Sequence, residues 1–316
     1  MSGRAGMLST QEIMALRGPK NRIDPLRPYA WLREMEINGC GELESFATLF
    51  LSNAECPFRC LMCDLWRNTT ELPVPPGAIS QQIQYGLAQL PAADSLKLYN
   101  SGNFFDVRAI ATAEHAGIAQ LVQGFRRVVV ENHPRLVGPA CIDFQRRIEP
   151  QLEIALGLET IHPEILPALN KQMTTEDFSR AVACLRAAEI DVRAFVLLQP
   201  PGLQGQESIK WAVRSIAFAF ECGVNCCSLI PVRQGNGALD ELARRGLHCE
   251  PTLAAMEQAL EQSLALKAGR VFMDVWDAHR FASCNACVEA RLQRLERINL
   301  KQHVCAPVQC ETCQHL

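Results

Sequence analysis

The chain of 316 residues lacks several features that would each indicate a class of protein. No apolar run reaches the roughly 18–20 residues that a membrane-spanning helix needs. The opening residues, MSGRAGMLSTQEIM, lack the long apolar core of a secretory signal peptide, so we expect a cytoplasmic protein with no membrane partner. The net charge of −3 provides no overall basic field to attract nucleic acid. These absences favour a cytoplasmic globular protein.

Two signatures of catalysis or cofactor binding are also missing. No G-x-G-x-x-G follows the first predicted strand, which disfavours an open Rossmann sheet. No serine or cysteine lies in a nucleophile-elbow motif. Neither dinucleotide binding of the Rossmann type nor covalent nucleophilic catalysis is therefore indicated.

Apolar runs and amphipathic stretches alternate along the middle of the chain. This alternation predicts parallel strands joined by right-handed crossovers, and hence an α/β fold with a partial (β/α)6 TIM-like barrel. In such a barrel the chemistry lies on loops at the carboxyl ends of the strands. Short runs rich in branched and aliphatic residues predict the strands 46–52, 95–101, 127–132, 152–159, 192–199 and 225–232. Amphipathic stretches predict the helices 78–90, 107–125, 174–189, 206–222 and 252–269.

The pattern divides the chain into three parts. Residues 1–45 are expected to form a helical N-terminal extension, and residues 46–270 the barrel. Residues 271–316 are expected to form a cysteine-rich, metal-binding C-terminal segment.

Fifteen cysteines are a high and odd number for a chain without an export signal. In a reducing compartment such thiols more often bind metals or do redox chemistry than form disulfides. Eight of them lie in two groups, discussed below. We interpret the other seven as small buried hydrophobic residues: Cys40, Cys141, Cys184, Cys222, Cys226, Cys227 and Cys249.

The first group has the spacing Cys56-x3-Cys60-x2-Cys63 and begins four residues after the first predicted strand. A structural zinc site usually closes its shell with four protein ligands. Three thiolates on one short loop instead suit three irons of a 4Fe–4S cluster, whose fourth iron stays open to a small molecule. Zinc and unligated thiols are the alternatives at this point.

This spacing, at this place in a (β/α) pattern, resembles the signature of the radical S-adenosylmethionine (radical SAM) superfamily. The resemblance implies an enzyme in which a 4Fe–4S cluster on the three cysteines binds SAM. The reduced cluster cleaves SAM to a 5′-deoxyadenosyl radical, which abstracts hydrogen from a substrate. An external one-electron reductant of the flavodoxin or ferredoxin type is implied as a partner.

The resemblance also implies residues that seat SAM. The segment NSGNFFD (100–106) stands where the family has a glycine-rich segment, VVVENHP follows the next strand, and ALGLET corresponds to a later motif that supports adenine. For the carboxylate in ALGLET, an ordinary role at a strand end is the alternative. The methionine before the third cysteine replaces a frequent aromatic residue. The implied residues are Ser101, Gly102, Asn103, Glu131, Gly157, Glu159 and Met62.

Four stretches of the chain occur together: LKLYNSGNFFD, VVVENHP, ALGLET with LNKQMTTEDFSRA, and FVLLQPPGLQGQESI. With them, roughly residues 45–245 further resemble the radical SAM subunit of archaeosine synthase and its bacterial relatives, within the group around the Elongator catalytic subunit. This implies a modified nucleoside in tRNA as substrate, which the basic segment 291–301 also favours. The stretch VRQGNGALDEL departs from the expected pattern, with Arg233 and Asn236 as candidate substrate contacts. That departure and the acidic net charge favour the alternative, a small metabolite or lipid precursor. A non-catalytic zinc-binding adaptor is the third hypothesis.

The second group of cysteines consists of two C-x2-C pairs and one further cysteine. It resembles a four-thiolate metal site, for which five cysteines are one too many. A structural zinc ion and an auxiliary iron–sulfur cluster both suit the spacing; the relatives slightly favour zinc, and unligated thiols are a further alternative. The candidate ligands are Cys284, Cys287, Cys305, Cys310 and Cys313, with His279, His303 and His315 in reserve.

Overall fold

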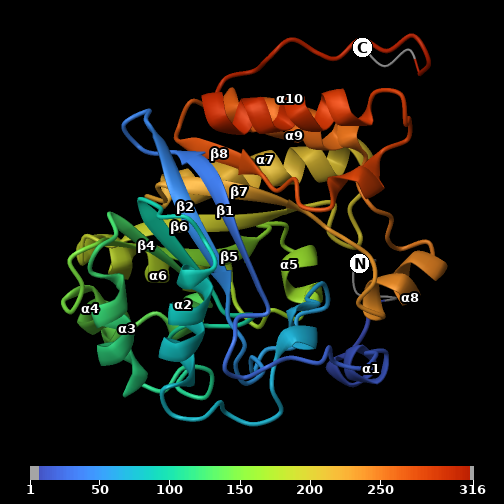
Figure 1. Ribbon diagram of the computed structural model, residues 1–316. Helices are drawn as coiled ribbons and strands as arrows, with labels where there is room; N and C mark the ends of the chain where they lie inside the picture. The colour runs from blue at the N-terminus through green and yellow to red at the C-terminus, as the bar shows by residue number, and fades with distance from the viewer. Residues whose placement is uncertain (1–6, 314–316) are drawn as a thin grey trace.

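A computed structural model describes residues 7–313, and its centre is one curled sheet of eight strands (Figure 1). Each strand pairs with the next one along the chain. The first pair is antiparallel, and every later pair is parallel. The strands are β1 (Ala30–Ile37), β2 (Leu43–Phe50), β3 (Ser95–Tyr99), β4 (Arg127–Asn132), β5 (Gln151–Glu159), β6 (Asp191–Leu198), β7 (Cys226–Pro231) and β8 (Arg270–Met273).

Helices cover the outer face of this sheet (Figure 1). The longer ones are α2 (Ala78–Ala88), α3 (Glu114–Val122), α4 (Pro139–Gln145), α6 (Thr175–Ala187), α7 (Gly205–Glu221), α9 (Leu253–Leu264) and α10 (Val288–Lys301). Shorter ones are α1 (Thr10–Ala15), α5 (Ile165–Ala168), α8 (Ala238–Arg244) and the 3₁₀ turns η1 (Leu65–Asn68), η2 (Pro134–Leu136) and η3 (Ala278–Phe281). In the described part of the chain, no helix combines the length and apolarity that crossing a bilayer requires.

The strands alternate between two apolar layers, because successive side chains point to opposite faces. Leu98 of β3 and Val130 of β4 face outward into the main core beneath the helices. Phe46, Val129 and Ala155 belong to a smaller group on the inner face. The larger core therefore lies between sheet and helices, and the barrel interior is a separate environment.

A buried ionic network lies inside the barrel near the amino ends of the strands. Arg193 of β6 pairs with Glu36 of β1 and with Glu153 of β5, each at 2.7 Å. Lys97 of β3 also pairs with Glu36. Breaking such a buried pair usually costs about 3–5 kcal/mol, because the remaining charge is left uncompensated. This network fills one end of the barrel, so the carboxyl end is the one available for chemistry.

The six predicted strands and the fold class are confirmed, with three differences. Residues 1–45 were expected to be helical, but their described part holds the six-residue α1, the eight-residue strand β1 and the first three residues of β2. The seventh parallel strand, β8, spans the boundary expected at residue 270. Helix α3 begins at Glu114 rather than at 107, because residues 107–113 are largely turns.

Candidate cluster and cofactor site

The three-cysteine loop connects β2 to η1 at the carboxyl end of the sheet. Segments from elsewhere in the sequence hold it in place. The Leu61 amide donates to the Leu169 carbonyl at 2.9 Å, and the Asn170 side chain donates to the Arg59 carbonyl at 2.7 Å. The Asn236 side chain donates to the Leu61 carbonyl at 2.8 Å. The loop is thus fixed by the regions after β5 and after β7.

Cys56, Cys60 and Cys63 are half-buried free thiols. Burial raises the pKa of Cys60 to about 11, and it also raises the pKa values of Cys56 and Cys63. The Asn103 side chain donates to the Cys56 sulfur at 3.1 Å. Three unbridged thiols on one anchored loop fit the needs of a cluster that takes three protein ligands, because the thiolate is the metal ligand.

The segment 100–103 lies against this loop and is held by Glu131. One carboxylate oxygen of Glu131 accepts from the Asn100 amide at 2.8 Å and from the Gly102 amide at 3.3 Å. Burial raises the pKa of Glu131 to about 7. Ser101 has a φ of 52° and its hydroxyl lies 3.0 Å from that of Tyr29. Glu131 therefore positions the glycine-rich segment, a role that the sequence did not predict.

Gly157 leaves room on the inner face of β5 for the side chains of Glu159 and Lys171, and the support of adenine expected of its segment stays a prediction. A Cβ atom there would lie 2.3 Å from Glu159 Oε1 and 2.3 Å from Lys171 Nζ. Glu159 and Lys171 form a buried ion pair at 2.6 Å. Lys171 was not among the predicted site residues, because nothing in its local sequence marks it.

Three other residues named from the sequence have structural partners. Met62 is half-buried and packs against an apolar cluster that includes Leu61. Arg233 pairs with Asp274 at 2.8 Å, and Asn236 uses its side-chain amide to bind the cysteine loop. Arg233 and Asn236 thus make contacts within the protein, and their contact with a substrate stays a prediction.

A series of aromatic rings leads into the barrel interior from β1 towards β6. The ring centroids are 5.7 Å apart for Tyr29 and Phe50, 6.0 Å for Phe50 and Tyr99, and 6.3 Å for Tyr99 and Phe195. Phe50, Tyr99 and Phe195 are only half-buried. Successive side chains of a strand point to opposite faces, so the positions of these aromatic residues along their strands place their rings on the inner face.

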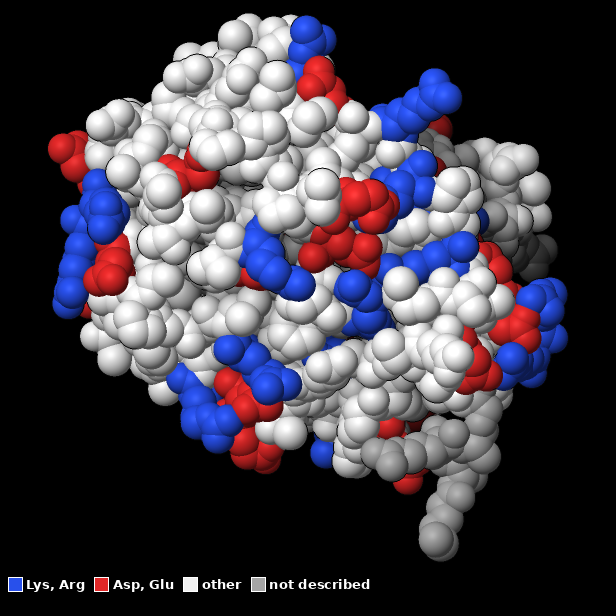
Figure 2. Space-filling model, turned by 90° about the horizontal axis from the view of Figure 1, so that it is seen from below, with Lys and Arg blue, Asp and Glu red and all other residues white. Residues whose placement is uncertain are grey.

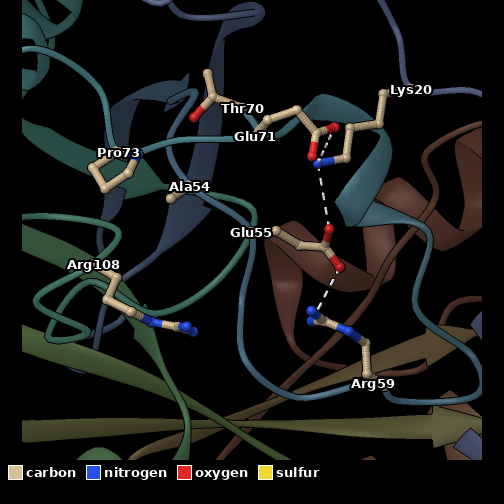
Figure 3. A pocket seen from close by; sticks show the side chains of 8 residues that line it. All are labelled: Lys20, Ala54, Glu55, Arg59, Thr70, Glu71, Pro73 and Arg108. Atoms are coloured by element: carbon tan, nitrogen blue, oxygen red, sulfur yellow. Dashed lines mark ion pairs between the residues drawn. The ribbon is translucent and has the colours of Figure 1, made fainter.

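A cavity of about 240 Å³ lies on the outer side of the cysteine loop, outside the barrel (Figure 3). Glu55 pairs with Lys20 and Arg59 at its wall, whereas Arg108 extends from the opposite side (Figure 3). Across the face seen in Figure 2, basic and acidic side chains are interleaved. This face of the described chain therefore presents no continuous basic surface.

The C-terminal cysteines form a second group. The sulfurs of Cys284 and Cys310 are 3.9 Å apart, and those of Cys287 and Cys313 are 3.8 Å apart. All four sulfurs lie within 4.8 Å of one another, an arrangement able to hold a metal ion. Cys305 lies apart from this group, with its sulfur 3.8 Å from the His303 carbonyl.

The reserve histidines make other contacts where they are described. His279 lies 2.8 Å from a Glu289 carboxylate oxygen, and His303 contacts the Lys301 carbonyl at 3.2 Å. His315 lies outside the described residues.

Two arginines of the basic segment 291–301 are not available on the surface, although Arg297 and Lys301 of that segment are exposed. Arg291 and Arg294 are buried in α10. Arg291 pairs with Glu257 at 2.6 Å, and Arg294 pairs with Glu261 at 2.5 Å. Because these two arginines lie on the buried face of α10, their charges pair with glutamates of α9 and do not face solvent.

Known proteins resemble this chain in sequence and in fold. No family model matches the chain. An uncharacterized protein of Methanocaldococcus jannaschii is 23% identical over 93% of this chain and 86% of its own length. Archaeosine synthase subunit beta of Thermococcus kodakarensis is 23% identical over 51% of this chain and 52% of its own length.

Among solved structures, Elp3 of Methanocaldococcus infernus, a radical SAM enzyme, superposes with a TM-score of 0.52 and 14% identity. The match covers 70% of this chain and 59% of the Elp3 chain, so more than a third of Elp3 has no counterpart in it. The chain has the fold of the radical SAM enzymes, which it resembles in structure.

Proposed function

We propose that this protein is a radical SAM enzyme whose 4Fe–4S cluster is held by Cys56, Cys60 and Cys63. The observation that carries the proposal is the set of three unbridged, half-buried thiols on an anchored loop at the carboxyl end of β2. When bound and reduced by an external one-electron donor, the cluster supplies the electron that cleaves SAM to a 5′-deoxyadenosyl radical. The cysteines would hold the cluster, and the remaining chemistry depends on how the chain positions its two small molecules.

The segment 100–103 is the SAM seat in this proposal. Glu131 holds its backbone, and Asn103 links it to Cys56, so the segment and the cluster loop form one unit. The half-buried rings of Tyr99 and Phe195 hold the substrate inside the barrel and limit the access of water. A radical needs such a dry, apolar environment, because exposure would let it react with other groups.

A modified nucleoside in tRNA is the substrate class that we favour. The aromatic series gives a planar base several faces on which to stack, at about 1–3 kcal/mol for each stacked base. The likeness to archaeosine synthase subunit beta supports the same class. The alternative is a small metabolite or lipid precursor, which the interleaved charges of Figure 2 favour.

The proposal predicts that Cys60→Ala removes the 4Fe–4S cluster, because two remaining thiols do not hold three irons. The test is iron and sulfide content after anaerobic reconstitution. Cys184→Ala is the matched control, since Cys184 is an exposed cysteine on α6. An unchanged iron content in Cys60→Ala would contradict the assignment. Iron in the wild type would exclude the zinc-binding adaptor.

For the C-terminal group we propose a single tetrahedral ion, with zinc as the metal. Zinc–sulfur bonds of about 2.3 Å place the sulfurs of a tetrahedral site about 3.8 Å apart. The sulfur–sulfur separations of 3.8 and 3.9 Å in the structure match this value. Sulfurs bound to different corners of a cubane lie further apart than the 4.8 Å limit that all four meet.

A further inference from the structure

The position of Lys171 beside the cysteine loop has no role in the mechanism above. We propose that Lys171 is a positioning residue whose buried positive charge stabilises the reduced form of the cluster and so raises its reduction potential. The inference rests on the proposed function, because it requires the cluster on Cys56, Cys60 and Cys63. It concerns the resting cluster alone, before SAM or substrate binds.

The segment 169–172 is tied to the cysteine loop at three points. Two are the hydrogen bonds Leu61–Leu169 and Arg59–Asn170, at 2.9 and 2.7 Å. The third runs through His133, whose ring stacks on Phe58 of the loop with centroids 3.7 Å apart. The same ring contacts the Lys171 carbonyl at 3.0 Å. The backbone of Lys171 is therefore fixed relative to the cysteines.

The backbone around the ion pair is strained. Glu159, Asn170 and Gln172 have φ values of 67°, 54° and 60°, in the left-handed region that disfavours side chains. The register of β5 against β6 shifts between Gly157 and Glu159. Such strain concentrates where a structure must place a functional group. Here the strained backbone directs the side chains of Lys171 and Glu159 toward each other.

The charge of Lys171 lies beside the cluster loop. Arg59 and Leu61, which flank Cys60, are hydrogen-bonded to Asn170 and Leu169, the two residues that precede Lys171. Burial by itself lowers the pKa of Lys171, but the carboxylate of Glu159 beside it contributes to a net rise of that pKa, so Lys171 stays protonated. Lys171 is 7% exposed, so solvent screens its charge little. An electron added to the cluster is stabilised by this charge.

The experiment is an EPR-monitored redox titration of the full chain, reconstituted anaerobically and kept free of SAM. For Lys171→Met we expect the ratio of reduced to oxidised cluster at a fixed potential to fall at least tenfold. A tenfold change corresponds to about 59 mV for a one-electron couple, here towards more negative potential. Lys171→Arg keeps the charge, so we expect its ratio to stay within about twofold of the wild type.

Glu159→Gln gives an independent test in the opposite direction. It removes the negative partner and leaves the cation, so the same ratio should rise. Arg135→Gln is the matched control, since Arg135 binds the Gln172 carbonyl at 3.0 Å but is exposed. Its ratio should not change.

An unchanged ratio in Lys171→Met with full iron content would overturn the inference, as would a fall of the ratio in Glu159→Gln. If Lys171→Met fails to hold iron, the decision rests on Glu159→Gln, where an unchanged ratio also overturns the inference. Failure of the proposed function is distinguishable, because then the wild type itself assembles no cluster. A lysine that only contacts SAM would leave the SAM-free titration unchanged.

Discussion

His133 connects the cysteine loop to the segment around Lys171, between α5 and α6, through a single neutral ring. Its Nδ1 accepts from the Arg135 amide at 3.1 Å, so Nε2 carries the proton and donates to the Lys171 carbonyl. Burial lowers the pKa of His133 to about 3, and the nearby Lys171 charge adds to this. Protonation of Nδ1 would leave the Arg135 amide without its acceptor. It would also place a positively charged imidazolium near the positive charge of Lys171.

At the scale of this residue we predict a specific loss of stability in acid. The folded-state pKa is lowered from 6.5, so the stabilisation is complete above pH 6.5 and is lost as the pH falls towards 3. Between pH 7 and pH 5 the loss from this group is about 2 kcal/mol in the free energy of unfolding. Urea unfolding at both pH values, in wild type and in His133→Phe, measures it. The variant should lose less stability than the wild type, and equal losses would refute the prediction.

Single residues differ in how far the sequence identifies them. Cys56, Cys60 and Cys63 were found because their spacing is itself the signal. Asn236 was not assigned its role, because it reaches the cysteine loop from a distant part of the chain. Lys171 was missed for a similar reason, because the hydrogen bonds of its neighbours Leu169 and Asn170 to that loop join segments far apart in sequence. The same applies to Glu131, whose polar position after β4 was predicted while its backbone partners were not. Contacts between distant segments depend on the crossovers of the fold, which no local pattern specifies.

Among the elements, α10 covers the open edge of the sheet. Its Asn299 side chain accepts from the Met273 amide at 2.8 Å, and Gln302 accepts from the Val271 amide at 2.8 Å. An uncovered edge strand would leave these backbone amides free to pair with a strand of another chain. The tail after α10 runs back along the helix (Figure 1), and Arg294 donates to its Cys305 carbonyl at 2.6 Å. The four-cysteine group fastens the end of this tail.

For this segment we predict about one zinc ion per chain, bound by four of the five cysteines. Cys310→Ser should lose the zinc and make residues 302–313 sensitive to limited proteolysis, because metal-binding energy becomes folding energy. Cys305→Ser is the matched control and should keep both zinc and protease resistance. Metal analysis and mass spectrometry of the digests give both results. Zinc loss in Cys305→Ser, or iron and sulfide bound at this group, would contradict the prediction.

The elements themselves were largely predictable from periodicity. The six strands β2 to β7 are rich in branched and aliphatic residues, as strands buried on both faces require, and the few charged residues among them, such as Lys97 and Arg193, are paired inside the barrel. Strand β1, with sequence AWLREMEI, lies at the edge of the sheet and alternates half-buried and exposed residues. Its Glu36 forms an ion pair with Arg193 inside the barrel. Strand β8 has only four residues, too few to give a pattern. Both missed strands lie at the two ends of the sheet.

The molecule as a whole combines an acidic net charge with an aromatic barrel interior. Arg291 and Arg294 contribute no surface charge, and the face in Figure 2 interleaves both signs. A large phosphate-binding surface is not supported by these features. Recognition of a nucleoside would then depend on the base, with few contacts to the backbone.

We accordingly predict that tRNA binds with a weak dependence on salt. Each phosphate contact costs about 3.5-fold in affinity between 50 and 200 mM salt. We expect a total loss of about tenfold or less, measured by filter binding at both salt concentrations with tRNA carrying its native modifications. Tyr99→Ala should weaken binding at both concentrations. Absence of binding at 50 mM salt would instead favour the small metabolite or lipid precursor.

The central claim is that three cysteines present a cluster able to split SAM, and the release of 5′-deoxyadenosine tests it most directly. The reconstituted protein is incubated anaerobically with SAM and dithionite, and the nucleoside is measured by mass spectrometry. We predict its formation by the wild type and by Cys184→Ala, and none above background by Cys60→Ala. A wild type that carries four irons and four sulfides yet releases no 5′-deoxyadenosine, or a Cys60→Ala variant that releases as much as the wild type, would contradict the account.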